Sequence, residues 1–363
     1  MATPQDRPPA VVAVAAAVVA VAAAVVGALV ALVLGLVTFG VQATVHPADV
    51  PLAVAVGADA PPQLRAVADK LAGADAAEVA WRVAAPDEAR DLLKAQDVYG
   101  VLELAPGSAT VVLSGAVNPS GTQVAQQVLT GVAQGAGLPA EVVTLDPASA
   151  AGRTAPLAAS ALLWIGGLVA GAAFTVLSAR SRARVGVGAR LLGATTAAVL
   201  AVAVVAGFFA WWDPALPLGW DVLGYLALVA VSFALLQTGL LRVLGLRAMA
   251  VLAPLYLMAP AVAGQVPELL NPAYRALLWS WTPFRFSTEG LRALLQNGTL
   301  EAAQVWVFVG IALAGLLILL LPAMEAQPDL ADGVAVSGGA TPSRGEAASE
   351  SARRVVLPAD RKG

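Results

Sequence analysis

Six stretches of the chain contain no Asp, Glu, Lys or Arg and consist mainly of apolar residues. Each is long enough to cross a ~30 Å hydrocarbon core as an α-helix, which takes about 20 residues. Backbone N–H and C=O groups cannot stay unpaired in lipid, so each stretch must form a helix or belong to a closed β-barrel. The alternation of apolar and polar residues typical of a β-barrel strand is missing, so the pattern predicts six membrane helices. The stretches are Pro8–Ala48, Thr154–Ala179, Leu191–Trp212, Val222–Leu241, Ala248–Pro267 and Ala302–Met324.

The first stretch would be about 60 Å long as one helix, which is too long for one span and slightly short for two. Neither proline nor a turn cluster interrupts it between Ala10 and Val41, so we predict one span that continues into a stalk over residues 10–43. A cleaved signal peptide is the alternative, because Val41-Gln42-Ala43 resembles a cleavage site. The apolar region is much longer than the roughly 7–15 residues typical of a signal peptide.

Residues 44–153, between the first and second stretches, have the pattern of a small α/β domain that is fixed at both ends to membrane helices. Proline followed by acidic residues is typical of a helix start, and Asn118 before Pro119 is a plausible helix cap. A Pro106-Gly107 turn would join two of the strands. The predicted strands are Val50–Val56, Glu78–Val83, Val98–Leu104, Thr110–Leu113 and Glu141–Leu145, and the predicted helices are Pro61–Leu71, Pro86–Lys94 and Asn118–Gly135.

Arginines near the stretches predict the orientation, because cytoplasmic loops are enriched in basic residues. Arg242 and Arg247 follow the fourth stretch, whereas the loop Asp213–Asp221 has no basic residue. Four more arginines lie between the second and third stretches: Arg180, Arg182, Arg184 and Arg190. We therefore expect a plasma-membrane protein with both termini in the cytoplasm. Its expected regions are a short N-terminus (1–9), an extracellular domain (44–153), a five-helix membrane domain (154–324) with an outer segment (268–301), and a disordered tail (325–363).

The composition agrees with this class and narrows the chemistry. Hydrophobic residues make up 59% of the chain and charged residues 12%, against roughly 45–50% and 25% in soluble proteins. The net charge of −3 gives no basic surface for nucleic acid. There is no cysteine, one histidine (His46), and lysine only at Lys70, Lys94 and Lys362. These counts leave no lysine in a Walker A motif, and a Ser-His-Asp triad could use only His46, which lies at a membrane boundary without a convincing partner. They also make a zinc site very unlikely, so we expect neither an enzyme nor a cofactor.

Small residues at every fourth position in two of the stretches predict close helix packing, because they let backbones approach. They are Gly27 and Gly35, with Ala31 between them, and Gly167 with Gly171. From this spacing we expect the first and second spans to pack together, and a homodimer or heterodimer to form.

This architecture resembles the ABC-2-type transporter permease group, which includes relatives of the phage infection protein. Three segments carry the resemblance over about residues 10–324. Pro86–Pro106 (PDEARDLLKAQDVYGVLELAP) is similar to the group's helix-then-strand segment, and Ser114–Asn118 (SGAVN) is similar to the stretch that leads into that group's next helix. Trp281–Arg292 (WTPFRFSTEGLR) is similar to the segment before the last span.

The resemblance implies a permease subunit that exports a lipophilic or envelope-associated substrate and is energised by a separate ABC ATPase subunit. It implies that an ATPase-coupling loop contains Arg180, Arg182, Arg184 and Arg190. It places Pro283, Arg285, Glu289 and Arg292 on an outer re-entrant or gating segment. Two simpler interpretations stay open: the arginines only set the orientation, and Pro283–Leu295 is an amphipathic helix at the lipid surface.

Two other functions are consistent with the same sequence. A non-transporting scaffold would use the extracellular domain to bind an envelope component, and a membrane-embedded enzyme is disfavoured by the scarcity of catalytic residues. Members of the permease group usually have a longer cytoplasmic segment before the first span than the nine residues expected here, so a protein of this architecture that works without an ATPase is a further alternative.

Overall fold

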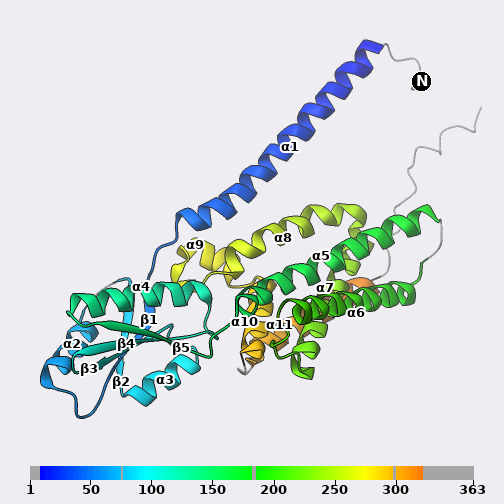
Figure 1. The fold of residues 1–363 in the computed structure, drawn as a ribbon. Coiled ribbons are helices and arrows are strands. Elements are labelled where there is room, and N and C mark those ends of the chain that lie inside the picture. Colours follow the sequence, from blue (N-terminus) through cyan, green and yellow to red (C-terminus); the bar gives the residue numbers. More distant parts are fainter. Residues whose placement is uncertain (1–8, 75–76, 182–184, 297–299, 322–363) are drawn as a thin grey trace, which may run out of the picture. The chain divides into compact units, whose positions relative to one another are not determined.

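The computed structural model describes residues 9–74, 77–181, 185–296 and 300–321. Within them, five helical stretches are long and apolar enough to cross a membrane. A domain with a five-stranded mixed sheet lies between the first of these stretches and the others in the chain (Figure 1). Residues 1–8 and the tail predicted to be disordered lie outside the described residues.

One of the five stretches contains two helices. The stretches are Ala20–Ala43 within α1 (Pro9–Ala43), α5 (Ala150–Arg180), α6 (Val187–Trp212), Trp220–Ala263, and α11 (Ala302–Leu320). The 44-residue stretch Trp220–Ala263 consists of α7 (Trp220–Leu244), a 3₁₀ turn and α8 (Met249–Ala263). The turn begins at Gly245, which has a φ of 60°. Glycine adopts this backbone conformation at little cost because it has no side chain. The fourth and fifth predicted helices are therefore separate helices within one continuous apolar stretch.

The α/β domain contains the predicted strands and helices with shifts of at most a few residues. Its strands are β1 (Val50–Val56), β2 (Val79–Ala84), β3 (Val101–Ala105), β4 (Ser108–Ser114) and β5 (Ala140–Leu145), and its helices are α2 (Pro62–Ala72), α3 (Pro86–Lys94) and α4 (Pro119–Gly135). The strand order is β2-β1-β3-β4-β5, and only the β3–β4 pair is antiparallel. Gly107, at a φ of 80°, forms the predicted turn of that hairpin. The Asn118 side chain caps α4 by accepting a hydrogen bond from the Ser120 amide at 3.0 Å.

Alternating strand residues supply two hydrophobic cores, one on each face of the sheet. On β1, Leu52 and Val54 face the core that includes α2 and α4, whereas Ala53 and Ala55 face α3. Side chains of a strand point alternately to opposite faces, so a strand that is apolar throughout is covered on both sides. This arrangement explains why β1 is a continuous hydrophobic run in the sequence.

Four aromatic rings form the centre of the membrane-helix bundle. Trp164 of α5, Phe233 of α7, Phe308 of α11 and Phe284 of α10 (Pro283–Leu295) are all fully buried. The ring centroids of Trp164 and Phe233 are 4.9 Å apart, and those of Phe233 and Phe284 are 5.7 Å apart. Edge-to-face and tilted rings at such distances attract each other beyond the area they bury. The cluster therefore joins four helices at one point.

Helices α7 and α11 touch through their backbones. A Cβ atom placed on Gly239 would lie 2.7 Å from the carbonyl oxygen of Gly315, and one placed on Gly315 would lie 2.6 Å from the carbonyl carbon of Leu235. Real side chains do not tolerate such contacts, so the two helices can approach this closely only because both positions are glycine. Backbone contact of this kind drives helix association in lipid, where the hydrophobic effect does not.

We predict that Gly315→Ala destabilises the bundle by about 1–3 kcal/mol, because α7 and α11 must move apart to accept the methyl group. Gly310→Ala on the same helix is the matched control, since a Cβ there meets nothing within 4 Å. Alanine also favours a helix over glycine by roughly 0.5–1 kcal/mol, so the control should be neutral or stabilising. Thermal unfolding of the purified protein in detergent measures both. Equal midpoints for the two variants would contradict the contact.

Candidate functional site

Helix α10 carries the predicted outer segment and lies inside the bundle. Thr282 has an extended backbone and Pro283 occupies the first turn, a position where its missing amide hydrogen costs nothing. Ten of the helix's 13 residues are buried, and it contacts α5, α7, α8 and α11. A helix lying on a lipid surface would have one uncovered face. The burial of α10 therefore favours a packed segment over an interfacial helix, which the sequence alone could not exclude.

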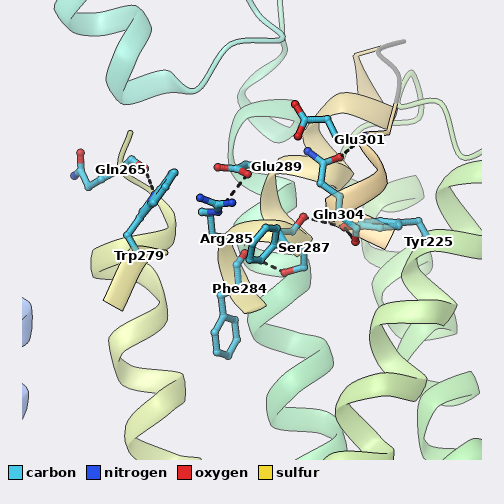
Figure 2. A network of polar contacts seen from close by, with 10 residues as sticks. Tyr225, Gln265, Trp279, Phe284, Arg285, Ser287, Glu289, Glu301 and Gln304 are labelled. Atoms are coloured by element: carbon cyan, nitrogen blue, oxygen red, sulfur yellow. Dashed lines mark hydrogen bonds and ion pairs between the residues drawn. The ribbon is translucent and has the colours of Figure 1, made fainter. Parts of the chain in front are cut away.

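Three charged residues follow one another along α10. Arg285 Nε lies 3.6 Å from Glu289 Oε2, and the Arg285 guanidinium lies over the Trp279 ring at 3.8 Å from its centroid. Figure 2 shows Arg285 between Trp279 and Glu289. Arg292, one turn further on, is only 6% exposed, and its Nε atom has no hydrogen-bond partner among the described residues. The helix thus holds one buried arginine, Arg292, and a half-buried pair, Arg285 and Glu289, where loss of water makes charge costly.

Hydroxyl groups fasten α10 to the helices around it. Ser287 Oγ donates to Ser160 Oγ of α5 at 2.7 Å. The Tyr225 hydroxyl of α7 donates to the carbonyl oxygen of Phe286 at 2.8 Å. Gly290 leaves the space that the Tyr225 ring fills. These contacts fix both the rotation and the height of the charged helix.

Residues 265–270 form a strap that connects α8 to the short helix α9 (Pro272–Tyr274) and joins the α/β domain. Val266 and Leu269 are part of the domain's core. The Ala48 amide donates to the Glu268 carbonyl at 2.9 Å, and the His46 amide donates to the Leu269 carbonyl at 3.2 Å. The strap is therefore built into the domain by both its backbone and its apolar side chains.

A pair of side chains strengthens this junction. The Tyr99 hydroxyl donates to Glu268 Oε2 at 2.6 Å. Burial, followed by the hydrogen bond to Glu268, raises the pKa of Tyr99. The hydroxyl therefore keeps its proton and acts as a donor at physiological pH.

The strap also contacts the charged helix. Trp279 Nε1 donates to the carbonyl oxygen of Gln265 at 3.2 Å (Figure 2), and the same indole ring lies under Arg285. A continuous set of contacts thus runs from Tyr99 in the α/β domain through the strap and Trp279 to Arg285 and Glu289. We take this set, together with Arg292, as the candidate functional site.

The arginines predicted to form an ATPase-coupling loop are only partly described. Arg180 ends α5 and is exposed, Arg190 lies on α6 with its guanidinium 5.7 Å from the centroid of the Phe174 ring, and Arg182 and Arg184 lie outside the described residues. Arg190 also lines a cavity of about 60 Å³ between α5, α6 and α7. The structure thus places Arg180 and Arg190 at the ends of consecutive helices.

The glycines predicted to pack helices have different surroundings. A Cβ at Gly171 would lie 2.8 Å from Leu241 Cδ1, and one at Gly167 would meet Gln237, so both face α7. A Cβ at Gly27 meets nothing within 4 Å in the described part of the chain, and one at Gly35 meets only Phe39 of its own helix. The predicted packing of the first span on the second through these glycines is therefore not what the structure has. Helix α1 instead contacts α8. The Leu36 carbonyl of α1 also accepts a hydrogen bond from the Tyr274 hydroxyl at 2.8 Å.

The single histidine, His46, lies in the loop between α1 and β1. The ring of His46 is exposed, with Nδ1 2.7 Å from the carbonyl oxygen of Pro47. Among the described residues, His, Asp and Glu form no group of three or more that could hold a metal ion.

Comparisons of the chain with protein-family models, curated proteins and solved structures gave no match. The site is therefore interpreted from its own geometry. Sequence reasoning placed Pro283, Arg285, Glu289 and Arg292 on one segment but missed Tyr99, Glu268 and Trp279 as its neighbours. The only local signal for the strap was the short polar break at Gln265–Glu268 after an apolar stretch.

We predict that Tyr99→Phe loosens the strap, because a hydrogen bond to a carboxylate is lost, at a cost of about 1–2 kcal/mol. Hydrogen exchange of peptides covering residues 44–50 and 265–270 should become faster. Tyr225→Phe is the matched control: it removes a buried tyrosine hydroxyl that holds α10 and not the strap. Unchanged exchange in Tyr99→Phe, or the same acceleration in both variants, would show that Tyr99 does not hold this junction.

Proposed function

We propose that this protein is the permease subunit of an ABC-2-type exporter that moves a lipophilic or envelope-associated substrate out of the cell. A separate ATPase would supply the energy, and the permease would work as a homodimer or heterodimer. The order of one apolar helix, an α/β domain and a group of apolar helices supports the proposal. It also agrees with the three sequence segments that resemble this group.

The observation that carries the proposal is the placement of one buried and two half-buried charges on α10, next to Trp279, which contacts the strap. Arg285, Glu289 and Arg292 lie on a packed helix that does not itself span the membrane. Charged groups inside a membrane protein are costly, and they usually mark a pathway. The contacts through Trp279 and Glu268 would let a movement of the α/β domain shift these charges, as expected of an outer gate.

We further propose six membrane crossings. A single helix of 44 residues would be about 66 Å long, roughly twice the hydrocarbon thickness. The break at Gly245 divides this stretch into α7 and α8, and α8 together with the 3₁₀ turn Gly245–Ala248 before it would have about the ~30 Å length of one crossing. Six crossings place both termini in the cytoplasm, as expected from the arginines at 180–190, and place the α/β domain outside.

This topology predicts which cysteine substitutions a membrane-impermeant maleimide labels in intact cells. The protein has no cysteine of its own, so there is no background. Ser108→Cys, exposed at the start of β4, should be labelled from outside, whereas Ser181→Cys, exposed at the end of α5, should be labelled only after permeabilisation. The reverse result would invert the orientation, and labelling of both in intact cells would rule out this topology.

The role of an ATPase is tested by affinity purification of the full-length protein from its native host. We expect an ATPase of the ABC class to co-purify. Replacing Arg180, Arg182 and Arg184 by Gln should lower its recovery about tenfold, the equivalent of roughly 1.4 kcal/mol. A triple replacement of Arg65 and Arg82 in the α/β domain and Arg153 in the first turn of α5 is the control and should leave the recovery unchanged. Absence of any ATPase would favour the scaffold function, and equal recovery from the two variants would remove the coupling role from the loop.

A further inference from the structure

A cavity of about 360 Å³ lies at the junction between the end of α1 and the strap. Its lining comes from the residues after α1, among them Asp49, from the strap, with Glu268 and Leu270, and from the segment around α9, with Arg275 directly after that helix. We call it the junction cavity. Its volume is within the ~300–1,000 Å³ typical of small-molecule sites.

Charges of both signs line the junction cavity, and no ion pair among the described residues joins them. Glu268 and Arg275 form none of the ion pairs found among the described residues. Glu268 receives the Tyr99 hydroxyl on Oε2, while its other carboxylate oxygen forms no hydrogen bond found in the described part of the chain. Asp49 adds a second carboxylate to the lining. The lining therefore matches a ligand that carries both an anionic and a cationic group.

Apolar surface continues from the cavity toward the membrane helices. Leu270, which lines the cavity, packs in one cluster with Val41 of α1 and with Ala261 and Val262 of α8. Further along α1, Leu36 and Phe39 are 58% and 76% exposed. A polar cavity beside an apolar helix surface suits an amphiphile, with its headgroup in the cavity and its acyl chains along α1.

The lining also distinguishes between cationic groups. Quaternary ammonium groups are bound by cages of Trp, Tyr or Phe, and none of these residues lines the junction cavity. Carboxylates instead bind a primary ammonium through its N–H donors. A guanidinium suits the phosphate of the same headgroup, because its fork of donors matches phosphate oxygens.

We infer that the junction cavity binds the headgroup of phosphatidylethanolamine, with Arg275 on the phosphate and Glu268 on the ammonium. The inference rests on the proposed topology, which puts the end of α1 at the outer surface of the membrane. Because Glu268 belongs to the strap, a bound headgroup connects the lipid to the contacts that reach α10.

The test measures binding of short-chain phospholipids to the purified full-length protein in detergent, by native mass spectrometry. Phosphatidylethanolamine should bind about tenfold more tightly than phosphatidylcholine or phosphatidylglycerol, the effect of one charge-assisted contact. Glu268→Gln should abolish this preference, and Arg275→Gln should weaken all three lipids. Glu141→Gln and Arg82→Gln, at exposed positions of the α/β domain, are the matched controls and should leave binding unchanged.

Several results would overturn the inference. Equal affinity for phosphatidylethanolamine and phosphatidylcholine would contradict the ammonium contact. The contact would also be contradicted if Arg275→Gln weakens binding, which shows that the lipid occupies the cavity, but Glu268→Gln leaves the preference for phosphatidylethanolamine unchanged. Equal affinity for soluble glycerophosphoethanolamine would exclude a lipid as the ligand. The recovery of an ATPase does not depend on this cavity, so the exporter proposal and the lipid site can fail separately.

Discussion

The contact of four aromatic rings, one each from α5, α7, α10 and α11, is the interaction on which the helix bundle depends. In lipid, apolar surface gains little by leaving its surroundings, so helices associate through close-fitting contacts. Trp164, Phe233, Phe284 and Phe308 supply such contacts at the centre, and Gly239 with Gly315 lets two of the helices approach to backbone distance. A short helix that carries three charges can be held inside the bundle because Phe284, at its beginning, belongs to this cluster.

The same helix is also in contact with a domain of different character. The α/β domain has its own two cores and hydrogen-bonded sheet, but it shares Val266 and Leu269 with the segment that leads to α10. Trp279 connects the two regions, with its indole N–H on the strap and its ring under Arg285. The strap and this guanidinium therefore contact the same indole ring.

Sequence reasoning predicted what depends on neighbours in the chain. The Asn118 cap, the Pro106-Gly107 turn and the alternation in β1 are local signals, and the elements they define lie at the expected positions. Contacts between distant segments gave no such signal: Tyr99 and Glu268 are 169 residues apart, and Gly315 looks like any other glycine in an apolar helix. Spacing identified Gly167 and Gly171 as packing positions, but it could not identify α7 as their partner. The burial of Arg292 was missed because its segment is too short and too polar to read as a membrane helix.

The strap has a consequence for biogenesis. The α/β domain is synthesised before most of the bundle exists, yet two residues of its core come from a segment more than a hundred positions later in the chain. Until that segment emerges, the domain has an unfilled apolar site on its surface. The core of the α/β domain is therefore completed late, only after the helices between the domain and the strap have been inserted correctly. An excised domain comprising residues 44–153 would lack part of its own interior, and a soluble fragment would need the strap supplied in trans or fused to it.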